Sequence, residues 1–117
     1  MGKDDYYTIV AKILVFLYKK LKGKDNRDVK DYVLPMTKDF PISEDYMQYV
    51  FEKITEQGFV ENVFITKGMG GVIVNIDYED MRITPAGIDY MLENSTVRKV
   101  IGGLKEAAEI SSLFNLL

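Results

Sequence analysis

The residues of this chain best suited to chemistry are three closely spaced acids, Asp77, Glu79 and Asp80. Their carboxylate oxygens are the kind of ligand that a hard cation such as Ca²⁺ prefers. The spacing is not that of an EF-hand loop, however, and acids in a turn after a strand are ordinarily solvated. We therefore expect no metal site at this turn.

Histidine and cysteine are both absent from the 117 residues. Without them the chain has no histidine to activate a serine or cysteine nucleophile, no imidazole ligand for a metal and no thiolate for zinc. Disulfide bonds are excluded for the same reason. We expect a protein with no catalytic residues and no cofactor, and hence not an enzyme.

Glycines at positions 68, 70 and 71 raise the alternative of a phosphate-binding loop. A P-loop requires Lys-Ser or Lys-Thr after its last glycine, and then a helix. Here the strand-like run from Val72 to Ile76 follows the glycines, and a similar run from Phe59 to Ile65 precedes them. Two runs of β-branched and aromatic residues joined by glycines predict a β-hairpin.

A basic run between Lys19 and Lys30 is a candidate surface for contacts with phosphates, because only Asp25 and Asp28 interrupt it. A neighbouring helix and the hairpin can add contacts to the same nucleic acid. The candidate nucleic-acid-binding residues are Lys19, Lys20, Lys22, Lys24 and Arg27 in this run, Gln48, Tyr49 and Lys53 in the helix expected at residues 44–57, and Lys67 in the hairpin.

The helix expected at residues 44–57 has clear limits, because Ser43 can cap its first turn and Gly58 can end it. An apolar stripe at helical spacing must be buried. Its members are Met47, Val50, Phe51 and Ile54. The outward face is acidic and lacks arginine, the residue that most often reads guanine in the major groove. A sequence-specific DNA reader built on this helix is therefore disfavoured.

A second pair of capping signals lies further along the chain. Thr84 is placed as an N-cap and Pro85 as the first helical residue, while Asn94 and Ser95 end this helix and can cap the next. Residues 96–117 then carry apolar side chains at helical spacing. These signals predict one or two C-terminal helices.

Two further helices are expected near the start of the chain. Residues 5–21 carry apolar side chains over most of the helix surface, Leu21 included, as a central helix or one shared with a partner does. Asn26 can cap a short second helix that reaches Leu34 before Pro35 breaks it.

A family resemblance rests on the segment from Ile83 to Asn94. With the helix at residues 43–58 and the glycine-bearing hairpin before it, this segment is similar to the YjcQ family of small bacterial and prophage proteins. The residues that carry the similarity are Ile83, Thr84, Gly87, Tyr90, Glu93 and Asn94. The resemblance implies a winged-helix domain of uncharacterised function. The connection between Asn26 and Ile42 departs from it, because a helix-turn-helix usually has a turn of ~3–4 residues.

Together these observations predict an α+β fold, a winged helix-turn-helix with three N-terminal helices, a β-hairpin wing and one or two C-terminal helices. We expect residues 1–95 to form the winged-helix domain. Residues 96–117 are a helical extension that either packs on that domain or mediates dimerisation. The candidate dimer contacts are Val100, Leu104, Leu113, Phe114, Leu116 and Leu117.

Composition favours a soluble cytoplasmic protein with no membrane partner. The chain is 47% apolar, enough for one core, and has a net charge of −3. Its apolar run from Ile9 to Leu17 is interrupted by Lys12 and is far shorter than the ~20 residues that span a bilayer.

Two functions remain open at this point. The first is a DNA-binding transcription regulator that acts as a homodimer and uses the basic run and the wing on double-stranded DNA. The alternative is a protein–protein interaction module on a winged-helix scaffold that does not bind DNA and engages its partner through the apolar tail or the acidic helix.

Overall fold

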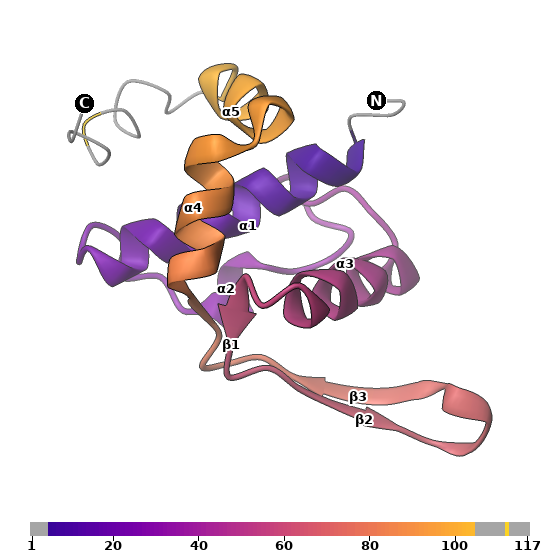
Figure 1. Cartoon of the computed structure of the whole chain (residues 1–117). Helices are drawn as coiled ribbons and strands as arrows, with labels where there is room; N and C mark the ends of the chain where they lie inside the picture. Colours follow the sequence, from indigo (N-terminus) through magenta and orange to yellow (C-terminus); the bar gives the residue numbers. More distant parts are fainter. Residues whose placement is uncertain (1–4, 105–111, 113–117) are drawn as a thin grey trace.

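The computed structural model describes residues 5–104 and residue 112. Within these residues the chain folds into five α-helices and two small antiparallel sheets, which confirms the α+β class. The elements, in chain order, are α1 (Asp5–Leu21), α2 (Val29–Tyr32), α3 (Glu44–Glu56), β1 (Val60–Glu61), β2 (Phe64–Lys67), the short 3₁₀ helix η2 (Met69–Gly71), β3 (Ile73–Asp77), β4 (Arg82–Ile83), α4 (Pro85–Glu93) and α5 (Ser95–Gly102) (Figure 1).

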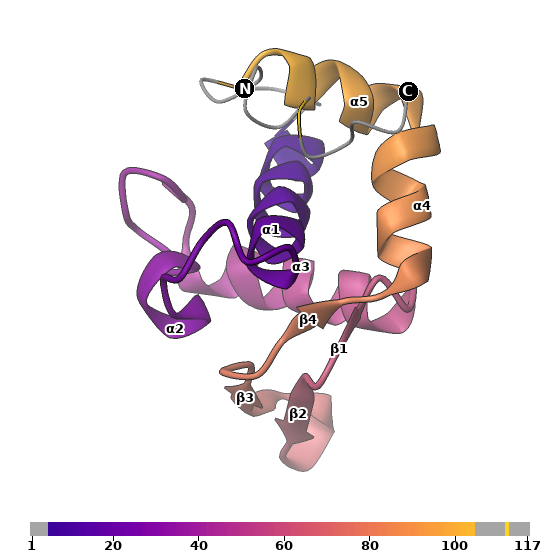
Figure 2. The ribbon, with the colours of Figure 1, turned by 90° about the vertical axis from the view of Figure 1, so that its left-hand side faces the viewer.

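Helix α1 is the centre of the core. It packs against α3, α4, α5 and β4, which surround it (Figures 1 and 2). Apart from the half-buried Lys12, every side chain from Ile9 to Lys19 is buried. A helix that is apolar nearly all round is stable only when it is enclosed. Of the two alternatives that the wide apolar surface left open, a central helix and a helix shared with a partner, the structure shows the central helix. No helix in the described part of the chain is long and apolar enough to cross a membrane.

The second helix is shorter than predicted. Helix α2 begins after Asp28, not at Asn26, and ends before Leu34. Asn26 cannot serve as the cap because the chain around it forms a different turn, in which the Arg27 backbone N–H donates to Asp25 Oδ1 at 3.0 Å. Residues 33–43 then lead to α3 and bury the Phe40 ring completely.

Helix α3 confirms its sequence signals. Ser43 Oγ accepts a hydrogen bond from the Tyr46 backbone N–H at 3.1 Å, and Gly58 follows the helix at a φ of +77°. The helix ends at Glu56, one residue earlier than expected. The predicted stripe of Met47, Val50, Phe51 and Ile54 is buried.

The strand-like run from Phe59 to Ile65 is not one strand, as predicted, but two. Asn62, at a φ of +66°, separates β1 from β2. Strand β1 pairs with β4, so that Val60 lies opposite Ile83, and β2 pairs with β3. The β2–β3 hairpin projects away from the helices, with η2 at its tip (Figure 1).

Helix α4 is joined closely to the end of α3. Thr84 Oγ1 accepts from the Gly87 backbone N–H at 3.1 Å and donates to the Gly58 carbonyl oxygen at 2.5 Å. A Cβ atom on Gly87 would lie 2.3 Å from the Phe59 carbonyl oxygen, so only glycine fits this contact. The rings of Phe59 and Tyr90 stack with centroids 4.2 Å apart.

Helix α5 covers α1 and α4. Asn94 Oδ1 accepts from the Val97 backbone N–H at 3.0 Å, as its predicted capping role requires, and Val97 is fully buried. Of the candidate dimer contacts, Val100 and Leu104 are half-buried and pack against the core. The remaining four, Leu113, Phe114, Leu116 and Leu117, lie outside the described residues, and the dimer stays a prediction.

Candidate functional site

The predicted basic run is largely engaged in folding the chain after α1. Lys20 Nζ donates to the Arg27 carbonyl oxygen at 2.5 Å, and the Arg27 guanidinium binds both carboxylate oxygens of Asp25. The hydrogen bond from the Arg27 side chain holds the pKa of Asp25 below its usual value. The same guanidinium lies 4.0 Å from the centroid of the Tyr32 ring. These contacts stabilise the loop and leave less of its positive charge for a ligand.

Lys22, Lys24 and Lys30 are the exposed lysines of this run, and Lys30 is paired with Glu79, which leaves Lys22 and Lys24. Lys22 Nζ lies 5.6 Å from the Tyr18 ring centroid, and neither lysine forms an ion pair within the described residues. The loop that carries them and the tip of the hairpin lie at opposite ends of the molecule (Figure 1). The structure therefore does not bring the predicted basic run and the hairpin tip onto one contact surface.

The predicted contacts on α3 and the hairpin are cations paired with acids. Lys67 Nζ in β2 binds Glu52 Oε2 in α3 at 2.9 Å, which lowers the pKa of Glu52 and raises that of Lys67. Lys53 Nζ lies 3.4 Å from Glu56 Oε1. Each pair is one cation and one carboxylate, so this face gains no positive charge from its lysines.

The polar candidates on α3 differ in exposure. Gln48 is half-buried, whereas the Tyr49 ring is exposed. Tyr49 belongs to an aromatic group, with ring centroids 6.4 Å from Tyr46 and 6.2 Å from Tyr6. Lys53 Nζ lies 5.4 Å from the Tyr49 ring centroid. The exposed face of α3 is thus aromatic and acidic.

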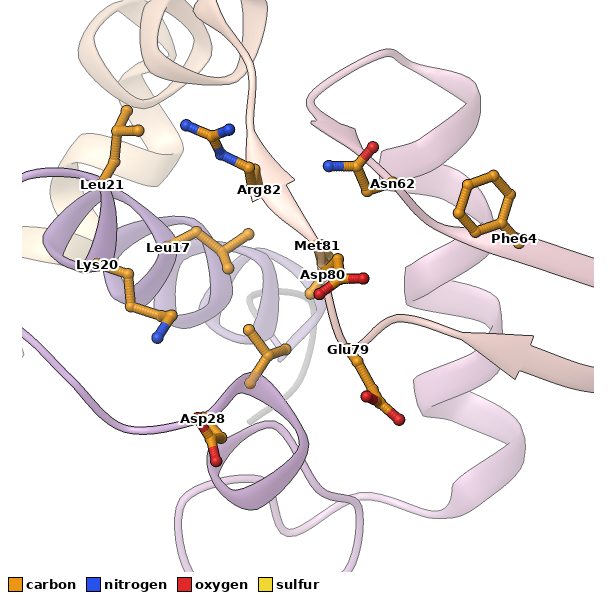
Figure 3. Close-up of a pocket in the computed structure, with 11 residues that line it drawn as sticks. Leu17, Lys20, Leu21, Asp28, Asn62, Phe64, Glu79, Asp80, Met81 and Arg82 are labelled. Carbon is orange, nitrogen blue, oxygen red and sulfur yellow. The ribbon is translucent and has the colours of Figure 1, made fainter.

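A groove of about 840 Å³ lies at the base of the hairpin, at a place that no sequence pattern predicted (Figure 3). It is formed by four segments that are far apart in the chain: the last turn of α1, the start of α2, the residues around the start of β2, and the turn before β4. The residues that line it are Leu17, Lys20, Leu21, Asp28, Val29, Asn62, Phe64, Glu79, Asp80, Met81 and Arg82.

The groove combines an apolar interior with a polar rim. Leu17, Val29 and Met81 belong to the buried core. Leu21 and Phe64 also line the groove but are 44% and 63% exposed. Leu21 was predicted to face inward, and it is exposed because it is the last residue of α1. Two large apolar side chains thus stand open to solvent at one groove.

Two of the three acids considered for a metal site, Glu79 and Asp80, line this groove. Glu79 Oε2 accepts from Lys30 Nζ at 3.1 Å, an ion pair that links the turn before β4 to α2. This contact raises the pKa of Lys30. Within the described residues, no group of three or more potential ligand side chains is arranged to hold a metal ion.

Exposed apolar side chains continue from the groove along the hairpin. Val72 and Val74 are both 63% exposed and Met69, at the tip, is 95% exposed. A hydrophobicity pattern alone could not identify them as surface residues, because the same valines would suit a strand packed on a core.

A comparison with families of known proteins places this chain. The family model described as YjcQ protein matches residues 12–110, which is most of the chain. No curated protein and no solved structure matches.

Proposed function

The chain belongs to the YjcQ family, and we propose that it is a protein-interaction module whose docking site is the groove at the base of the β2–β3 hairpin. The observation that carries the proposal is the exposure of two large apolar side chains, Leu21 and Phe64, that line the same groove as the buried Met81. Apolar walls with a polar rim are the composition of a protein contact surface. A partner would bury apolar side chains of its own against Leu21 and Phe64.

The distribution of charge supports a protein partner over DNA at this face. The cations of α3 and the hairpin, Lys53 and Lys67, are each paired with a carboxylate. The acids Asp28, Glu79 and Asp80 line the groove itself. Bringing them to a DNA backbone would place carboxylates against phosphates and would release few counterions.

The test is photo-crosslinking followed by binding of the purified partner. A benzophenone amino acid at position 64 in the source cell will label whatever occupies the groove. Phe64→Ser should then reduce the affinity for the purified partner by at least about tenfold, because a large apolar anchor is lost. Phe64 is exposed, so the substitution leaves the fold intact.

Met36→Ser is the matched control, because Met36 is an exposed apolar residue that does not line the groove. It should leave the affinity unchanged. Equal losses in both variants, or a cross-link to nucleic acid alone, would refute the proposal.

DNA binding by a regulator is the second candidate function, and one observation favours it. Lys22 and Lys24 are exposed, close in sequence and without an ion pair in the described part of the chain. If both contact phosphates, the logarithm of duplex affinity falls linearly with the logarithm of salt concentration. Replacing both by alanine should then reduce that slope by about two. Absence of duplex binding at low salt removes this candidate.

A further inference from the structure

The groove at the base of the hairpin continues into a smaller recess of about 390 Å³. The two are continuous because Asp28, Glu79 and Asp80 line both, while Lys30 and Asp31 of α2 line the recess alone. Four carboxylates thus meet one ammonium group among the described residues of the recess, and Glu79 already binds that ammonium at 3.1 Å. The recess is therefore a negatively charged end of the groove.

Two of these acids keep their capacity to accept hydrogen bonds. Asp28 stands at the N-cap position of α2, where an aspartate ordinarily accepts from a backbone N–H of the first turn, but its side chain makes no such bond. The Asp80 carboxylate likewise has no hydrogen bond or ion pair within the described part of the chain. Both residues are exposed, so a partner can reach them.

The cations that line the groove are directed elsewhere. Lys20 Nζ donates to a backbone carbonyl oxygen of the loop before α2 at 2.5 Å. Arg82 lies at the opposite end of the groove from Asp28 and Glu79 (Figure 3). The groove is thus asymmetric in charge, and this asymmetry orients a charged partner that lies along it.

The arrangement of the acids favours an extended cation over a metal ion. No group of three or more potential ligand side chains in the described residues is arranged to hold a metal ion. A guanidinium group, in contrast, presents five donors in one plane and can bind carboxylates that stand apart. It is always charged and is more weakly hydrated than an ammonium group, so it loses less hydration at a protein surface.

The acids alone would be an ordinary solvated turn, and the apolar side chains that share their groove make the difference. Leu21 and Phe64, both exposed, line the same groove. We propose that the partner of the groove is a protein segment that carries an arginine close to a large apolar residue. The arginine binds Asp28 and Asp80 while the apolar residue packs against Leu21 and Phe64. This inference rests on the function proposed for the groove and adds the chemistry of its partner.

The experiment selects binders of the immobilised full chain from a library of random peptides displayed on phage. Peptides whose binding is lost on Phe64→Ser are those that occupy the groove. Among them we expect arginine to be enriched within a few positions of a large apolar residue, and aspartate and glutamate to be depleted.

The selection separates this inference from the function on which it rests. Phe64-dependent peptides that are apolar but not enriched in arginine would overturn the inference and leave the groove as a docking site. Failure to obtain any Phe64-dependent peptide would overturn both.

A double-mutant cycle then locates the charge contact. Asp28→Asn combined with Asp80→Asn should reduce the affinity for a selected synthetic peptide by about tenfold. Replacing the arginine of that peptide by citrulline should cause a similar loss with the wild-type protein and little further loss with the double variant. Asparagine is accepted at an N-cap and in a turn, so both substitutions leave the fold intact.

The matched control removes the same charge away from the groove. Asp45→Asn combined with Asp89→Asn changes two exposed acids that line neither the groove nor the recess. It should alter the affinity for the peptide by less than about twofold. Equal losses in the two double variants would assign the effect to diffuse charge and overturn the inference.

Discussion

The helical body and the β2–β3 hairpin differ in how their side chains are buried. In the body, α1 is enclosed along most of its length. In the hairpin, no residue from Phe64 to Asp77 is fully buried. Its described links to the body include the packing of Ile76 against the core and the ion pair between Lys67 and Glu52. Folding free energy therefore resides in the body, and the hairpin is available for contacts with other molecules.

The largest expected effect compares an aspartate in each region. Ile83 is buried in β4, so Ile83→Asp removes apolar contact and buries a charge, which should reduce the free energy of unfolding by about 3–5 kcal/mol. Val74 is exposed in β3, and Val74→Asp should change the free energy of unfolding by less than about 0.5 kcal/mol. Urea denaturation measures both. Similar losses of unfolding free energy at the two sites would mean that the hairpin contributes to the stability of the core.

Two glycines provide a smaller, opposed pair of effects. Gly87→Ala forces a methyl group against the Phe59 carbonyl oxygen and should destabilise the body by about 1–3 kcal/mol. Gly102 lies in α5 with no atom near its absent Cβ, so Gly102→Ala should stabilise by up to about 1 kcal/mol. Thermal unfolding of both variants checks the signs. A stable Gly87→Ala variant would show that α4 can move away from α3.

The smallest effect is a pH dependence that is greater in the hairpin than in α1. The hydrogen bond from Lys67 lowers the pKa of Glu52 below its ordinary value of 4.5 in the folded protein. The ion pair therefore stabilises the docked hairpin above about pH 4.5, and this contribution is lost as the pH falls through the lower folded pKa. Amide-exchange protection factors in β2 and β3 should fall over that range by more than those in α1, although the Asp25–Arg27 pair gives the body a pH dependence of its own.

Lys67→Met is the control for this pH effect, because it keeps the length of the side chain and removes its charge. In that variant the protection of β2 and β3 should no longer depend on Glu52. A wild-type protein in which hairpin and α1 protection decline by the same amount would contradict the separation of the two regions.

The capping signals were predictable because they are local. Ser43, Thr84 and Asn94 each accept from a backbone N–H three residues ahead, a contact contained in a window of four residues of sequence. The enclosure of α1 was also predictable, since its apolar surface has no polar side wide enough to face water.

Two of the errors arose where residues distant in the chain come together, and one arose from a competing local turn. The run from Phe59 to Ile65 divides because β1 finds its partner in β4, more than twenty residues later, and not in β3. The predicted cap at Asn26 failed because Asp25 and Arg27 form their own turn. The groove was missed because it is assembled from four separated segments. Periodicity within one segment carries no information about such meetings.

The pairing of β1 with β4 makes the hairpin an exchangeable insert. Glu61 and Arg82 lie directly opposite each other, so the chain departs from the body and rejoins it at adjacent positions. Beyond these strands the tip of the loop is exposed. Doubling the length of a loop whose ends are already joined costs only ~0.6 kcal/mol of closure entropy. Hairpins of different reach and sequence can therefore be carried by one unchanged set of helices.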